Sequence, residues 1–136
     1  MATGTLVDTN ILLDVLTQDP TWFGPSAEAL AQAAEVGLLF INPIIYAEVS
    51  VRFSRIEELE EAMPPSDYRR APLPWEAAFL AGKAFVDYRD RGGTRSSTLP
   101  DFYIGAHAAV ADVDLLTRDR GRYATYFPTV TVRTPG

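Results

Sequence analysis

The sequence predicts an α/β domain in which helices cover both faces of a central, mainly parallel β-sheet. Short apolar runs that fit buried strands alternate along the chain with longer segments that fit helices, which is the pattern of βαβ units. The chain has 136 residues, of which 47% are hydrophobic and 22% are charged, as in ordinary globular proteins. Residues 1–136 are therefore expected to form a single domain, without an internal repeat or a linker.

The composition excludes several classes of site. The chain has no cysteine, which removes disulfides, zinc–thiolate sites and a cysteine nucleophile. No apolar run approaches the ~18 residues of a membrane span, and the N-terminus lacks the basic and apolar regions of a signal peptide. We therefore expect a cytoplasmic protein without a membrane partner.

The chain is acidic, with 12 Lys and Arg against 18 Asp and Glu and a net charge of −6. A protein that coats nucleic acid through its surface charge is expected to be basic, so this class is disfavoured. A metal-dependent nuclease is not disfavoured, because its acids hold cations and the cations meet the phosphate. If four of the 18 acids belong to such a site, the other 14 nearly balance the 12 basic residues, so the acidity does not argue against a nuclease.

The first strand and the helix after it frame a candidate ligand. Residues 5–8 predict a buried strand, and the apolar run after them predicts a helix over residues 11–17. Thr9 or Asn10 is expected to cap this helix, since a side-chain oxygen accepts a free amide hydrogen of the first turn. Ligands of open α/β sheets bind outside the carboxyl ends of the strands. Asp8 stands at such an end and is the first candidate metal ligand.

The next crossover begins with a loop over residues 18–25, which contains two prolines and a glycine. An Ala-rich helix over residues 26–36 follows and is expected to end at Gly37. Residues 38–41, with the sequence LLFI, form an entirely apolar run. Such a run is typical of a parallel strand that is buried on both faces.

A helix start is specified most clearly at Asn42 and Pro43. Asn is a favoured cap and Pro a favoured first helical residue. Together they predict a helix over residues 44–53, which carries Glu48. A second helix is predicted over residues 56–63, and the two prolines that follow it end it.

The second half of the chain continues the alternation of strands and helices. A short strand is predicted near residues 70–73 and a long helix over residues 74–91, with Phe79, Phe85 and Val86 among its buried residues. The remaining predicted elements are a polar loop over residues 94–99, a helix from Pro100, strands over residues 114–117 and 130–132, and a short helix within residues 119–127.

Four acids hold positions that a parallel sheet can bring to a ligand site. Asp8 and Asp119 each follow a strand, so both are expected at the same edge of the sheet. Glu48 lies in the helix after the second strand. Asp101 lies in the first turn of its helix, and it reaches the site only if that helix start points toward the same edge. A carboxylate cluster without Cys or a nearby His suits Mg²⁺ or Mn²⁺ better than zinc, although solvated surface acids are the alternative for each residue taken alone.

Longer motifs carry a resemblance that spans about residues 5–133. The motifs are Val7-Asp8-Thr9-Asn10 with its apolar run, Asn42-Pro43 with Ala47-Glu48-Val49, PDFYIGAHA from Pro100 to Ala108, and LLTRDRGRY from Leu115 to Tyr123, closed by Tyr126-Phe127-Pro128. With these motifs in this order, the chain resembles the PIN domain family. It is most similar to the VapC-like toxins of type II (VapBC) toxin–antitoxin systems.

The resemblance implies a three-layer α/β/α sandwich and a Mg²⁺- or Mn²⁺-dependent endoribonuclease. The catalytic and metal-binding residues that it implies are four acids: Asp8, Glu48, Asp101 and Asp119. Polar residues beside them would position the carboxylates or water: Thr9, Asn10 and Thr117.

The resemblance also implies two protein partners, a cognate VapB-like antitoxin and a second copy of the chain in a homodimer. The antitoxin is expected to bury an apolar peptide in a groove near the site. Residues at helical spacing are a plausible wall of that groove: Tyr46, Val49, Phe53 and Ile56.

Three basic residues close to the acids in sequence are candidates for contact with RNA phosphates: Arg95, Arg118 and Arg120. A solvated helix face is the alternative interpretation of these side chains. His107 lies six residues after Asp101, more than one helical turn away and on a different face. We therefore expect His107 to serve packing or to lie on the surface.

The sequence thus predicts a metal-dependent endoribonuclease toxin that hydrolyses RNA phosphodiester bonds and is neutralised by an antitoxin. One alternative is a metal-dependent phosphatase similar to the haloacid dehalogenases, which also begin with an Asp after a strand. That class requires a second Asp two residues later, where this chain has Asn10. The other alternative is a non-catalytic PIN-like binding protein.

Overall fold

The computed structural model describes residues 4–95 and 99–136. Its centre is a five-stranded sheet with the strand order β3-β2-β1-β4-β5, and every neighbouring pair of strands is parallel. The strands are β1 (Gly4–Val7), β2 (Leu38–Ile41), β3 (Arg69–Arg70), β4 (Asp114–Leu116) and β5 (Val132–Arg133). β1 is the central strand, and all four of its residues are buried.

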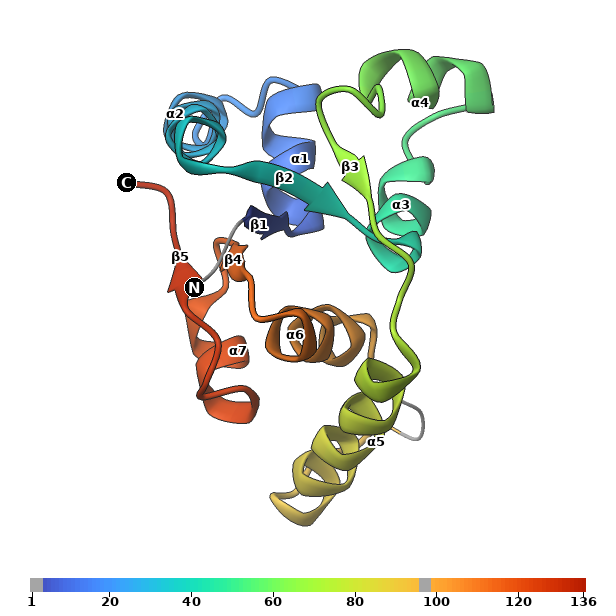
Figure 1. Cartoon of the computed structure of the whole chain (residues 1–136), viewed down its shortest axis with the longest axis vertical. Helices are drawn as coiled ribbons and strands as arrows, with labels where there is room; N and C mark the ends of the chain where they lie inside the picture. Colours follow the sequence, from blue (N-terminus) through green and yellow to red (C-terminus); the bar gives the residue numbers. More distant parts are fainter. Residues whose placement is uncertain (1–3, 96–98) are drawn as a thin grey trace.

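Helices lie on both faces of this sheet (Figure 1). The helices are α1 (Thr9–Leu16), α2 (Phe23–Val36), α3 (Pro43–Ser50), α4 (Ile56–Ala62), α5 (Trp75–Asp90), α6 (Pro100–Ala111) and α7 (Arg120–Tyr126). Helices α1 and α2 cover one face, whereas α6 covers the other and α5 packs on the outside of α6. The predicted α/β/α fold with a parallel sheet is thus confirmed. Within the described residues, every helix is too short or too polar to cross a membrane.

The start of α1 differs from the prediction, because Asp8 itself is the N-cap. Its backbone is extended (φ −69°, ψ 154°), and its Oδ1 accepts a hydrogen bond from the Thr9 amide at 2.7 Å. The helix therefore begins at Thr9, and the prediction of Thr9 or Asn10 as the cap is wrong. The Asn10 side chain is used elsewhere: its Nδ2 donates to Thr117 Oγ1 at 3.3 Å, and its Oδ1 accepts from the Arg118 amide at 3.2 Å.

The start of α3 confirms the sequence prediction. Asn42 Oδ1 accepts a hydrogen bond from the Ile45 amide at 2.9 Å, and Pro43 is the first helical residue. Because the Asn42 oxygen is used in this cap, its Nδ2 is the donor in the 3.0 Å contact with His107 Nδ1. His107 is buried, and burial lowers its pKa. Of the two expectations for His107, packing in the interior or a place on the surface, the structure shows the first.

Several element boundaries differ from the predictions. Helix α2 begins at Phe23 and includes Pro25, whose missing amide hydrogen is not needed in the first turn. Helix α3 ends at Ser50 rather than at residue 53. Strand β3 ends before Pro72, because proline cannot donate to the strand ladder. Strand β5 likewise begins two residues later than predicted.

Helix α5 turns a different face toward the core than expected. Its buried residues are three alanines about one turn apart: Ala77, Ala81 and Ala84. Small side chains at these positions allow α5 and α6 to approach closely. The predicted core residues Phe79 and Val86 are instead 69% and 53% exposed, so their predicted burial is wrong. Phe85 is half-buried and packs against the core.

Candidate active site

The carboxyl ends of β1 and β4 place Asp8 beside Thr117. Val7 pairs with Leu116 in register, so the next residue of each strand lies at the same edge of the sheet. Asp8 is only 4% exposed. Its Oδ2 accepts hydrogen bonds from the Thr117 hydroxyl at 2.8 Å and from the Tyr123 hydroxyl at 3.0 Å. A buried carboxylate is thus held in one orientation at the end of the central strand.

Burial raises the pKa of Asp8 from 3.8 to about 6. The hydrogen bond from Thr117 opposes this shift, whereas the negative charge of Asp101 adds to it. A carboxylate that is costly to ionise is stabilised by a bound cation, because the cation compensates for the lost solvation. The electrostatics of Asp8 therefore suit a metal ligand.

A single phenol links Asp8 to Asp101. The Tyr123 hydroxyl lies 3.0 Å from Asp8 Oδ2 and 3.2 Å from Asp101 Oδ1, and its one proton can be donated to only one of them at a time. Burial and the charges of both acids raise the pKa of Tyr123, so the phenol stays protonated. The start of α6 therefore does point toward the sheet edge that carries Asp8.

Glu48 joins this group through Thr9. The Thr9 hydroxyl donates to Glu48 Oε1 at 2.6 Å, while the Thr9 amide donates to Asp8 at 2.7 Å. Side chains from α1 and α3 therefore meet at the same edge of the sheet. Thr9, which was predicted to position the acids, contacts both of them.

Asp119 lies at the rim of the group. Its side chain is 43% exposed, and it caps α7 through a long contact of 3.5 Å from the Arg122 amide. The Asp119 amide donates to the Thr117 hydroxyl at 3.0 Å, and Asn10 Nδ2 donates to the same oxygen at 3.3 Å. Thr117 thus connects Asp119 and Asn10 to Asp8.

Two further side chains of this site, Tyr123 and Arg122, lie in the LLTRDRGRY motif but were not among the predicted site residues. Arg122 Nη1 donates to Asp101 Oδ2, and its Nε lies 3.5 Å from Asp119 Oδ2. The hydrogen bond with Asp101 is the main cause that raises the pKa of the Arg122 guanidinium. Both residues follow Asp119 by about one helical turn, and side chains at that spacing lie on the same face as the residue that starts the helix. That position was the signal that could have identified them.

The three arginines predicted to contact RNA lie in different settings. Arg118 forms a two-bond ion pair with Asp14, at 2.9 and 3.1 Å, and its guanidinium lies 4.9 Å from the centre of the Trp22 ring. It is therefore engaged with α1 and the segment before α2. Arg95 and Arg120 are exposed.

The donor set suits a hard cation, although the acids do not converge on one point. Among residues 4–95 and 99–136, no three carboxylate or imidazole groups are arranged to hold a metal ion as they stand. Asp8 and Asp101 meet at one phenol, and Arg122 pairs with Asp101. The donors are all carboxylate oxygens, the ligand type that Mg²⁺ and Mn²⁺ prefer. The residue types therefore fit such an ion.

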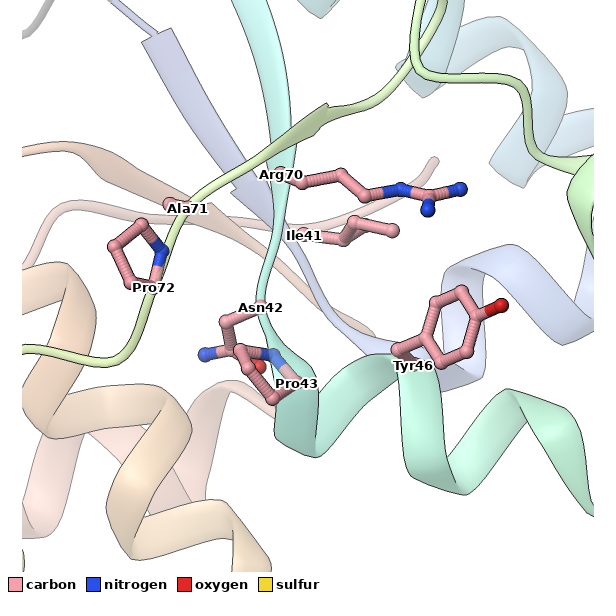
Figure 2. A pocket seen from close by; sticks show the side chains of 7 residues that line it. All are labelled: Ile41, Asn42, Pro43, Tyr46, Arg70, Ala71 and Pro72. Atoms are coloured by element: carbon pink, nitrogen blue, oxygen red, sulfur yellow. The ribbon is translucent and has the colours of Figure 1, made fainter.

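A cavity of about 350 Å³ lies beyond the carboxyl end of β2 (Figure 2). Arg70 and Ile41 extend from neighbouring strands on the side where Tyr46 projects from α3. The Arg70 guanidinium lies 5.1 Å from the centre of the Tyr46 ring, and the Tyr46 hydroxyl donates to Glu60 at 2.6 Å. Tyr46, one of the four residues predicted for the antitoxin groove, therefore lines a cavity. Val49 is fully buried in the core, so its predicted place on a groove wall is wrong.

The chain resembles known proteins in sequence and in structure. A family model described as PIN domain matches residues 5–128. A chain of the VapBC2 complex from Rickettsia felis bound to a DNA fragment from their promoter is similar, with a TM-score of 0.73 and 16% identity over 97% of this chain and 98% of that chain. A chain of a toxin–antitoxin complex from Klebsiella pneumoniae has a TM-score of 0.71 and 25% identity over 98% of both chains. A chain of VapBC-1 from nontypeable Haemophilus influenzae has a TM-score of 0.71 and 17% identity over 96% of both chains. No curated protein sequence matches the chain.

Proposed function

This chain belongs to the PIN domain family, and we propose that it is a Mg²⁺- or Mn²⁺-dependent endoribonuclease that acts as the toxin of a type II toxin–antitoxin pair. The observation that carries the proposal is the meeting of Asp8 and Asp101 at the Tyr123 hydroxyl. This meeting point lies at the carboxyl end of a parallel sheet, where α/β folds bind their ligands. Glu48 adjoins it through Thr9.

The residues proposed to hold the ion are the predicted acids: Asp8, Glu48, Asp101 and Asp119. When bound, such an ion makes water more acidic and neutralises the charge that develops on a phosphate. The chain itself fixes the ligands. The Thr117 and Tyr123 hydroxyls orient Asp8, and the Thr9 hydroxyl orients Glu48. Ligands held in this way by outer hydrogen bonds bind metal more tightly.

A cognate VapB-like antitoxin is the proposed partner, and RNA is the proposed substrate. The similar chains from Rickettsia felis and Haemophilus influenzae come from VapBC complexes. On this chain, the cavity beside Tyr46 and the 63% exposed side chain of Ile56 offer apolar surface for a partner peptide. Cleavage of cellular RNA would take place in the cytoplasm.

The outer face of α5 supports a homodimer. Trp75, Phe79 and Val86 are 89%, 69% and 53% exposed, and their spacing places them on one side of the helix. Such a stripe of large apolar side chains is typical of an interface. Light scattering is expected to give twice the chain mass for the wild type and the chain mass for Trp75→Ser/Phe79→Ser. Val51→Ser, at a single apolar side chain that is 81% exposed, is expected to remain dimeric. A monomeric wild type would contradict the dimer.

Calorimetric titration of Mn²⁺ into the antitoxin-free protein is the first test of the proposed function. The wild type is expected to bind the ion saturably. The Asp8→Asn/Asp101→Asn variant is expected to lose this binding, because both carboxylates are proposed ligands. Asp67→Asn removes an exposed carboxylate between α4 and β3 and is expected to bind like the wild type. The titration precedes any cleavage assay, because a nuclease that is selective for one RNA is inactive on another.

Failure of the folded wild type to bind Mn²⁺ has two explanations, which a second titration separates. The ion is recruited only with RNA, or the protein is the non-catalytic alternative. The titration is therefore repeated in the presence of a bound oligonucleotide. Binding under this condition supports the proposed nuclease, and no binding under either condition contradicts it.

A further inference from the structure

A second cavity, of about 480 Å³, opens beside the acids, between residues of α5, α6 and α7 together with Arg95 and Leu99. Its volume lies in the range of pockets that hold small organic ligands. Its lining combines three aromatic rings with two guanidinium groups: Tyr88, Phe102, Tyr126, Arg95 and Arg122. Aromatic and arginine side chains together are the usual surface for unpaired nucleobases.

The three rings form one cluster. The ring centres of Phe102 and Tyr126 are 5.3 Å apart, and those of Tyr88 and Phe102 are 5.6 Å apart, both in edge-to-face arrangements. Phe102 is buried and anchors the cluster, whereas Tyr88 and Tyr126 are half-buried and reach the cavity.

Arg122 connects this cavity to the candidate metal ligands. The same side chain donates to Asp101 and lines the cavity. Two further arginines lie beside the cavity, of which Arg91 is paired with Asp87 at 3.1 Å. The Arg91 guanidinium lies 5.6 Å from the centre of the Tyr126 ring. Arg89 donates to the carbonyl oxygen of Arg95 at 2.6 Å, which ties the exposed Arg95 to the end of α5.

From this juxtaposition we propose that the cavity binds one nucleotide of single-stranded RNA next to the phosphodiester that is cleaved. The inference rests on the proposed function. Phe85 stacks on the Tyr88 ring, so the base stacks instead on the face of Tyr126 opposite Arg91, because every nucleobase has a π face and an unpaired one is free to leave its neighbours. Arg95 and Arg122 pair with the phosphate, which matches the fork of a guanidinium group. The cavity thereby selects an unpaired nucleotide over one held in a duplex.

The test measures RNA affinity without cleavage, in the full-length Asp8→Asn protein. The probe is a fluorescein-labelled single-stranded RNA of about ten nucleotides that contains all four bases, read by fluorescence anisotropy. Arg95→Gln and Tyr126→Leu are each expected to weaken binding by at least about fivefold, the smallest effect typical of one lost stacking or phosphate contact. Tyr126→Phe keeps the ring and is expected to retain the affinity of the parent.

Arg69→Gln is the charge control. It removes one exposed arginine from β3, the edge strand at the far end of the sheet order from β5, and is expected to bind like the parent. Equal weakening by Arg69→Gln and Arg95→Gln would overturn the proposal in favour of general charge attraction. Because Tyr126 packs against Phe102, thermal unfolding is measured for Tyr126→Leu. If that variant is unfolded, the RNA affinity of Arg95→Gln alone tests the proposal, because Arg95 is exposed.

Two further outcomes separate this proposal from the proposed function. If the parent binds RNA and both Arg95→Gln and a folded Tyr126→Leu bind equally well, the nucleotide cavity is overturned while the nuclease stands. If the parent binds no single-stranded RNA, the cavity is overturned as well. In that case the separate Mn²⁺ titration of the wild type decides whether the proposed function also fails.

Discussion

Combined replacement of Asp8→Asn and Asp101→Asn is expected to reduce Mn²⁺-dependent RNA cleavage by at least about a hundredfold, because bound metal supplies several kcal/mol of transition-state stabilisation. Asn keeps the size of each side chain and removes the charge that holds a cation. The Tyr123 hydroxyl contacts both carboxylates and keeps an oxygen acceptor in either amide, so the fold is expected to survive. Cleavage of total bacterial RNA and thermal unfolding of the variant measure the two parts of this expectation.

The matched control for this loss is Asp67→Asn, which makes the same chemical change at an exposed position. It is expected to cleave RNA at the rate of the wild type. A double variant that folds cleanly and still cleaves at full rate would show that Asp8 and Asp101 do not hold the ion. A wild type that neither binds Mn²⁺ nor cleaves any RNA would instead favour the non-catalytic binding protein.

Asp8→Asn alone is expected to stabilise the metal-free protein at neutral pH by about 1–3 kcal/mol in the free energy of unfolding. Burial is the main cause that raises the pKa of Asp8 from 3.8 to about 6. The carboxylate therefore ionises more easily in the unfolded chain, and at pH 7 its ionisation favours unfolding. An amide avoids this cost. Weaker hydrogen bonds from Thr117 and Tyr123 to a neutral acceptor offset part of the gain.

The pH dependence of this effect has a defined sign. The contribution of Asp8 to stability is complete below its unfolded pKa of 3.8 and is lost as the pH rises through its folded pKa of about 6. The advantage of Asp8→Asn over the wild type should therefore be smallest in acid and grow between about pH 4 and pH 7. Urea unfolding with a chelator at a series of pH values measures it. His107 titrates in both proteins, so its effect cancels in the difference.

An unfolding free energy that Asp8→Asn leaves unchanged or lowers at pH 7 would contradict the electrostatic account of this site. Asp67→Asn again serves as the control, because an exposed carboxylate is expected to change stability little. The double variant thus tests the metal site through activity, and Asp8→Asn alone tests it through the stability of the metal-free protein, with Asp67→Asn as the control for both.

Several elements could be predicted from the sequence because their causes are local. The LLFI run became β2, and Asn42 with Pro43 started α3, since apolar period and helix capping depend on neighbouring residues. Chain order also placed Asp8 and Asp119 after strands that a parallel sheet aligns at one edge. The cap of α1 was not predicted, because Asp8 was assigned only to the metal site, whereas its carboxylate also caps the helix.

The sequence pattern alone does not predict which face of α5 is buried. Its aromatic stripe and its alanine stripe both have helical spacing, so periodicity alone does not choose between them. Because α5 packs closely against α6, the alanines form its buried face and Phe79 is exposed. For the same reason, the spacing of Val49 did not show that it faces the core.

The sequence by itself determined the fold class and the acids that are candidates for the metal site. Only the tertiary structure decided which hydroxyls and cations surround those acids. The Thr117 and Tyr123 hydroxyls that contact Asp8 are 109 and 115 residues away along the chain. Such contacts depend on the order of the strands in the sheet and on the rotation of α7 about its own axis. The burial that raises the pKa of Asp8 has the same origin, because side chains from separate segments together exclude water from it.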